Sequence, residues 1–281
     1  MDARNVIKAA LWSTLTLACL GVCTTVCLAA TAPATSKINA GAGPIKATLY
    51  YHAENLGLPE RHLDRIEIFW QGREAFAGPL PENFTDAYPF DPKQPIIEAV
   101  DLNADGTPEI VVHTFTGGAH CCIGSVIYGY DPKSKHIAHL ARDWQSGGYL
   151  LKDVDGHHVL ISDDQRFAYA FASYAGSGEP IQIWAYAPVK LSDVTRCFPR
   201  LIHDDARRWW DAAEQEKREP YPETLGLLAA YAADEYLLGE RAKALSAIAH
   251  FDQQVTPSYL DALQKFLREN GYESTQRPAC P

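Results

Sequence analysis

The chain has 281 residues, which is enough for a leader followed by one large domain or two small ones. It carries 35 acidic against 25 basic residues, a formal net charge of −10 at pH 7. This acidic balance argues against nucleic acid and an anionic membrane surface as partners, because phosphates and acidic lipids would be repelled.

Residues 1–30 have the pattern of a secretory signal peptide. Basic Arg4 and Lys8 precede a long apolar run that ends in small residues. We expect cleavage near its end, no membrane insertion afterwards, and a periplasmic or secreted protein. A retained anchor is the alternative, since the apolar run approaches membrane-spanning length. Residues 31–45, rich in Ala, Thr, Gly and Pro, predict a flexible lead-in.

Residues 46–200 predict a β-rich domain, because β-branched and aromatic residues alternate between turn signals. A weak echo of the segment at Asp101 begins at Asp153, and this spacing suits a repeated four-stranded unit whose second copy binds no metal. The expected fold is mainly β, with propeller-like or related repeat sheets. The predicted strands are 46–52, 63–70, 74–77, 96–100, 110–115, 123–130, 136–141, 159–162, 166–173 and 181–186.

The segment after Val100 predicts a calcium loop. Oxygen-bearing side chains recur at every second position, and Gly106 permits a sharp turn. Calcium takes six to eight oxygen ligands, and backbone carbonyls serve alongside carboxylates. The predicted calcium ligands are Asp101, Asn103, Asp105, the carbonyl of Thr107, and Glu109.

Predicted strands flank this loop, and the helical calcium hand would need Glu at its twelfth position, where Val112 stands. The segment therefore resembles the loop of FG-GAP or VCBS-type repeats, found in integrin-like propellers and exported bacterial proteins. The run G-G-A-H-C-C from Gly117 and residues 163–184 also resemble such exported proteins. The resemblance implies a calcium-supported β fold and no particular reaction.

Four cysteines follow the leader, and an even number in an exported chain predicts two disulfides. Spacing leaves three pairings open. We favour distant partners for both Cys121 and Cys122, because a bond between adjacent cysteines strains the peptide. The disulfide candidates are Cys121, Cys122, Cys197 and Cys280.

Residues 201–281 predict a helical segment, because the apolar period changes from two towards 3.6. Asp204 or Asp205 is the expected cap of a first helix, and Gly239 the end of a second. Thr256 and Pro257 mark the start of the last helix, with Thr256 as the cap.

The favoured function is a non-enzymatic binding or structural module, stabilised by calcium and disulfides, with an unidentified protein or glycan partner. One alternative is a periplasmic hydrolase with a site between sheets and helices; its acid–base candidates are Asp163, Asp164, His120 and Glu179. Another is a thiol protein that uses Cys121 and Cys122, and it requires free thiols. His113, His157 and His158 are interpreted as ordinary hydrogen-bonded or solvated histidines.

Overall fold

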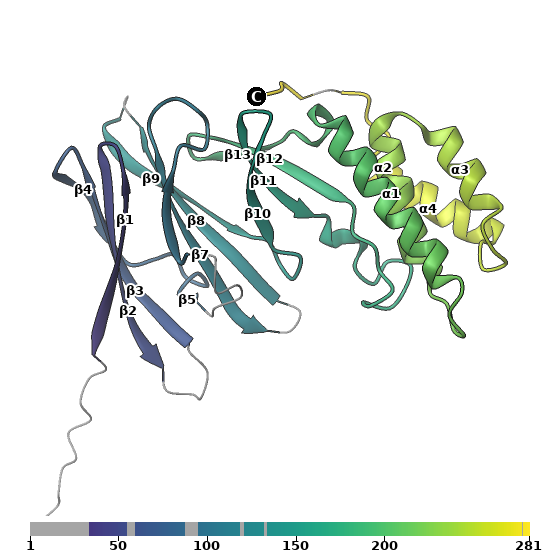
Figure 1. Cartoon of the computed structure of the whole chain (residues 1–281), viewed down its shortest axis with the longest axis horizontal. Helices are drawn as coiled ribbons and strands as arrows, with labels where there is room; N and C mark the ends of the chain where they lie inside the picture. Colours follow the sequence, from purple (N-terminus) through teal and green to yellow (C-terminus); the bar gives the residue numbers. More distant parts are fainter. Residues whose placement is uncertain (1–33, 55–59, 88–94, 119–120, 132–133, 277) are drawn as a thin grey trace, which may run out of the picture. The chain divides into compact units, whose positions relative to one another are not determined.

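The structure is a computed structural model that describes residues 34–54, 60–87, 95–118, 121–131, 134–276 and 278–281. Its first sheet has nine strands, in the order β1-β2-β3-β5-β7-β8-β9, with β4 paired to β3 and β6 to β7 (Figure 1). The strands are β1 Thr35–Ala42, β2 Ile45–Glu54, β3 Glu60–Trp70, β4 Arg73–Gly78, β5 Asp86–Ala87, β6 Ile97–Val100, β7 Glu109–Gly118, β8 Cys121–Asp131 and β9 His136–Asp143.

Strand β1 corrects the expectation of a flexible lead-in over 31–45. Its small residues have little strand propensity of their own. They pair with β2 in unbroken antiparallel register, from Thr35 opposite His52 to Ala42 opposite Ile45. A two-residue turn at Gly43, whose φ is +52°, closes this hairpin. Pairing with β2 therefore stabilises an extended conformation that the residues of β1 do not favour on their own.

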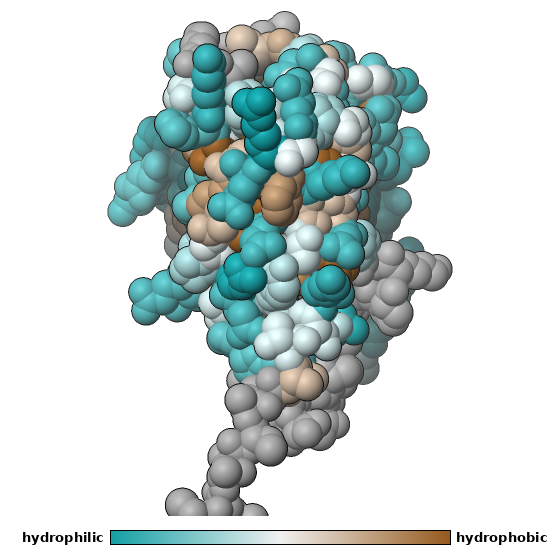
Figure 2. Space-filling view, turned by 90° about the vertical axis from the view of Figure 1, so that its left-hand side faces the viewer, coloured by the Kyte–Doolittle hydropathy of each residue, from teal (hydrophilic) through white to brown (hydrophobic). Residues whose placement is uncertain are grey.

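One face of the first sheet is buried, whereas the opposite face is open to water on β2 and β3 and buried on β7 and β8. Ile45, Leu49 and Ile66 of β2 and β3 share one core with Ile110 and Val126 of β7 and β8. On the outward face of β2 and β3, the Tyr50 hydroxyl and an Arg65 nitrogen both bond to Glu67. Figure 2 shows one side of the molecule, on which hydrophilic side chains surround a smaller apolar area.

The second sheet has four antiparallel strands in the order β10-β11-β12-β13. Val111 and Ile127 of the first sheet pack against Leu160 and Tyr186 of the second. The described strands thus form two sheets of unequal size, not a set of equal four-stranded blades. The strands are β10 Tyr149–Val154, β11 His157–Asp163, β12 Ile181–Ala187 and β13 Lys190–Asp193.

The echo at Asp153 is a tight β hairpin. Val154 faces His157 across a two-residue turn, in which Asp155 and Gly156 have φ angles of +54° and +85°. Both angles are positive, as in the Asp-Gly turn that matches the twist of paired strands. The turn accounts for the Asp and Gly in this segment. A second copy of the loop at Asp101 is therefore not needed to explain these residues.

Residues 166–173 do not form the predicted strand. The chain forms a short 3-10 helix, η1 Gln165–Phe167, and then runs through turns. Phe167 is buried and packs edge-on against Phe266 and Tyr272, whereas Tyr169 is 63% exposed. The alternating aromatic residues therefore do not lie on one face of a strand. Phe167 packs in the core of the helical part, whereas Tyr169 is exposed to solvent.

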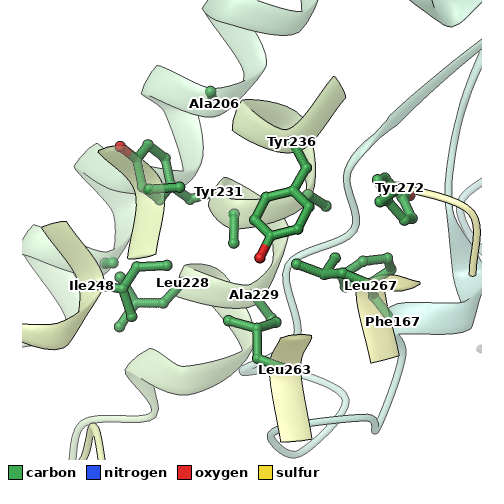
Figure 3. Packing of buried hydrophobic residues seen from close by; sticks show 14 of the residues in the cluster. Phe167, Ala206, Leu228, Ala229, Tyr231, Tyr236, Ile248, Leu263, Leu267 and Tyr272 are labelled. Atoms are coloured by element: carbon green, nitrogen blue, oxygen red, sulfur yellow. The ribbon is translucent and has the colours of Figure 1, made fainter. Parts of the chain in front are cut away.

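Four helices follow a second 3-10 turn, and they share a core that includes Leu228, Ile248 and Leu263 (Figure 3). Thr256 caps the last helix as predicted, since its hydroxyl accepts from the Tyr259 N–H at 3.2 Å. Gly239 ends α2 with a φ of +85°. Phe198, not an aspartate, precedes the first helix. The elements are η2 Thr195–Cys197, α1 Pro199–Glu216, α2 Thr224–Leu238, α3 Arg241–Ala249 and α4 Pro257–Glu269.

A disulfide joins Cys197 to Cys280, with 5.6 Å between their Cα atoms. This bond corrects the expectation that Cys121 and Cys122 each reach one of these two cysteines. Cys122 is itself disulfide-bonded, so it is not a free thiol. Within the described ranges, no helix is both long and apolar enough to cross a bilayer.

Candidate functional site

The loop between β6 and β7 gathers the side chains that the sequence singled out for calcium. Asp101 accepts hydrogen bonds from the N–H groups of Asp105 and Gly106, at 3.1 and 2.8 Å. Asp105 accepts one from the Thr107 N–H at 2.7 Å, and Asn103 bonds to Asp105 at 3.0 Å. Gly106 has a φ of +84°, a conformation that a Cβ would resist. The acidic side chains thus turn inward around their own loop.

Glu109 points into the same loop from the start of β7. Its Oε2 accepts from the Leu102 N–H at 2.9 Å, and only 3% of the residue is exposed. Burial raises the pKa of Glu109 to about 7, and the charges of Asp105 and Asp101 add to this rise. The loop therefore holds a desolvated carboxyl group close to two further carboxylates.

The loop is also attached to the second sheet. Leu102 is buried with Leu160 and Tyr186, two residues of the second sheet. Burial raises the pKa of Tyr186 to about 12, and the charges of Glu109 and Asp105 contribute. The acidic loop and the packing between the two sheets are consequently parts of one region.

The donor set fits a hard divalent cation in type, because carboxylate and amide oxygens are the ligands that calcium prefers. Asp101, Asn103, Asp105 and Glu109 would supply side-chain oxygens. The structure shows Thr107 donating its N–H and assigns no role to its carbonyl. Across the described residues, no three His, Cys, Asp or Glu side chains stand in a ready-made metal cluster. Loading would require the loop to exchange some of its internal hydrogen bonds.

Of the histidines that the sequence singled out, one links the two sheets and two lie beside a hairpin turn. His113 bonds to Glu98 through Nε2 at 2.8 Å and to the Tyr149 hydroxyl through Nδ1, so it links the first sheet to the second. His157 and His158 stand at the start of β11. His120 lies outside the described residues, as does the side chain of Cys121.

The hydrolase candidates come together only in part. Asp164 is buried; it forms an ion pair with Arg166 and accepts from the Tyr272 hydroxyl at 2.7 Å. Asp163 lies 3.9 Å from Arg208, and burial raises its pKa to about 7. Glu179 accepts from the Gln165 amide, and burial also raises its pKa. Glu179 is therefore close enough to both Asp163 and Asp164 for their charges to interact, and Asp164 also bonds to Tyr272 of the helical core.

A second pair of carboxyl groups was not found from the sequence. Asp205 of α1 accepts from the Ile181 N–H and the Trp209 indole, both at 3.0 Å, and binds Arg208. Asp234 of α2 is fully buried, and neither of its oxygens accepts a hydrogen bond. Burial, and then the Asp205 carboxylate, hold the pKa of Asp234 well above its usual value. The sequence offered one signal for this buried carboxyl group, because Asp234 lies inside the apolar run LLAAYAADEYLL.

Residues 202–271 match the family model described as the sll0997 C-terminal domain. The chain is 29% identical over 206 residues to a probable thylakoid lumen protein, sll0997, of Synechocystis sp. (strain ATCC 27184 / PCC 6803 / Kazusa). That match covers 63% of this chain and 60% of the relative. The match therefore spans less than two thirds of the relative.

A further relative is the uncharacterized protein y4bJ of Sinorhizobium fredii (strain NBRC 101917 / NGR234), 28% identical over 207 residues. It is matched over 60% of this chain and 31% of its own length. One solved structure, described as a Xanthomonas Type IV Secretion System related protein, is 14% identical with a TM-score of 0.27. It covers 58% of this chain and 97% of its own.

Proposed function

We propose that the protein is an exported, non-enzymatic binding or structural module whose loop at Asp101 takes up one calcium ion. The observation that carries the proposal is the inward turn of Asp101, Asn103 and Asp105 around a loop closed by buried Glu109. Calcium would neutralise carboxylates that the fold already holds together. The resemblance to FG-GAP and VCBS loops supports the same proposal.

The expected role of the ion is to stabilise the packing between the two sheets. Leu102 belongs to the loop and is buried against the second sheet. An ion that binds the folded loop and not the unfolded chain raises the free energy of unfolding by an amount that grows with the logarithm of the free ion concentration above its dissociation constant. The partner would be a protein or a glycan, and the relative's name, a probable thylakoid lumen protein, supports an exported location.

The test is calorimetric. We expect one calcium ion to bind per chain and to raise the melting temperature, and EDTA to reverse the rise. Asp105→Ala is expected to abolish both effects. Asp155→Ala, which removes an Asp from the hairpin turn instead, is the matched control and should keep the calcium response. Equal melting curves of the wild type with calcium and with EDTA would refute the calcium site.

A second candidate function is acid–base hydrolysis at Asp163. The observation in its favour is a carboxyl group with a pKa of about 7, beside Arg208 and close to Glu179. The wild type would then cleave one class of chromogenic glycoside or ester, and Asp163→Asn would lose that activity. No turnover of any of these substrates by the wild type would reject this candidate.

A further inference from the structure

We propose that a cavity between the second sheet and the segment after α4 is a binding site for a small carboxylate-bearing solute. The cavity has a volume of about 330 Å³, at the lower end of the range for small-molecule sites. Its walls come from η1, β12, η2, the end of α2 and the residues after α4. It lies apart from the calcium loop and shares no lining residue with it.

Arg196 is the group that points to an anion. Its guanidinium donates to two neutral acceptors, the carbonyl oxygens of Leu237 at 2.8 Å and of Tyr272 at 3.0 Å. Among the described residues, no carboxylate lies within ion-pair distance of it. Burial lowers the pKa of Arg196, which shows that the charge is partly withdrawn from water. The charge of Asp193 acts on Arg196 without forming a direct ion pair. A partly desolvated guanidinium that lacks a direct ion pair is the feature that a carboxylate ligand would complete.

The rest of the lining favours a carboxylate over a phosphate. Gln182, Asn270 and Thr195 contribute neutral amide and hydroxyl groups. Arg166 also lines the cavity, but its charge is matched by Asp164. Asp193 adds a negative charge to the lining. An arginine without a direct ion pair, beside one aspartate, suits a singly charged carboxylate, which an arginine fork can bind through two parallel hydrogen bonds.

The disulfide fixes one wall of this cavity. Ser274, Gln276 and Pro278 line it and lie between α4 and Cys280. Cys280 is bonded to Cys197, the residue next to Arg196. The same bond therefore positions both the cationic side chain and the segment opposite it.

Isothermal titration of the oxidised protein with L-lactate, L-glutamate and inorganic phosphate tests the proposal. We expect saturable binding of at least one carboxylate and none of phosphate. Binding of phosphate alone would overturn the assignment to carboxylates, and the absence of saturable binding by all three probes would overturn the site.

Two variants separate binding from folding. Gln182→Glu places a negative charge in the lining and should weaken carboxylate binding by at least about tenfold, while leaving the melting temperature close to that of the wild type. Gln215→Glu makes the same change on an exposed position of α1 and should bind as the wild type does. Unchanged affinity in Gln182→Glu would place the ligand elsewhere and refute the proposal.

Discussion

Asp163 and Asp234 show how position changes the chemistry of the same side chain. Asp163 is about one third exposed and faces Arg208, yet its pKa rises to about 7. Asp234 is fully buried beside Asp205, and burial, followed by the Asp205 charge, holds its pKa well above its usual value. Both groups hold protons in the folded state that the unfolded chain releases near pH 4.

Stability should therefore fall as pH rises. Each of these groups binds more protons when folded, so its contribution is greatest below the unfolded pKa of about 4 and is lost towards the folded pKa. For Asp163, the pH range over which this stabilisation is lost ends near pH 7. We expect the urea midpoint to fall between pH 4 and 7, measured at constant ionic strength.

Asp163→Asn should reduce this fall, because the amide does not titrate. The exposed Asp211 of α1 offers a control, and Asp211→Asn should leave the slope unchanged. A wild-type midpoint that rises steadily over the same interval would contradict the assigned direction of both pKa values.

At the scale of elements, the packing of the segment after η1 on α2 depends on glycine. A Cβ on Gly226 of α2 would lie 2.3 Å from the carbonyl oxygen of Gly176 and 2.9 Å from the Cα of Ser177. Gly178 approaches Ala230 one helical turn later. The absence of side chains lets two backbones meet, and this contact holds residues 164–180 against the helix.

Gly226→Ala should destabilise the protein although alanine is the better helix former. The propensity gain is about 1 kcal/mol, whereas forcing two backbones apart costs about 1–3 kcal/mol. We expect a lower free energy of unfolding in urea. Gly78→Ala is the control, since its new Cβ would meet the ring of Phe76 at 3.3 Å, and a ring can move. A more stable Gly226→Ala variant would show that the close approach is not required.

The elements were predictable where local signals agree with the tertiary fold. The strand at 63–70, the cap at Thr256 and the helix end at Gly239 all carry such signals. Strand β1 and the segment after η1 were missed because distant partners, β2 and the helices, decide their conformations.

The candidate site also contains residues that the sequence predicted and residues that it did not. The spacing of Asp101, Asn103 and Asp105 was visible in the sequence, because a single loop holds all three. The pairing of Asp205 with Asp234 depends on how α1 packs against α2, and no local pattern encodes it.

Across the whole molecule, the bond between Cys197 and Cys280 should provide much of the stability of the helical part. It closes a separation of 83 residues. Removing such a cross-link typically costs about 2–4 kcal/mol, because the unfolded chain regains freedom. The double variant Cys197→Ser/Cys280→Ser should show this loss in urea unfolding. An unchanged unfolding midpoint would mean that helix packing alone suffices.

The position of this bond also orders events during synthesis. All four helices lie between Cys197 and Cys280, so the ribosome delivers the second sulfur only after the whole bundle has been made. The bond can therefore form only when every residue of the four helices is already present in the chain. In the interval before Cys280 is available, Cys197 has only the earlier cysteines as possible partners within the chain, and the native bond requires that it does not remain paired with them.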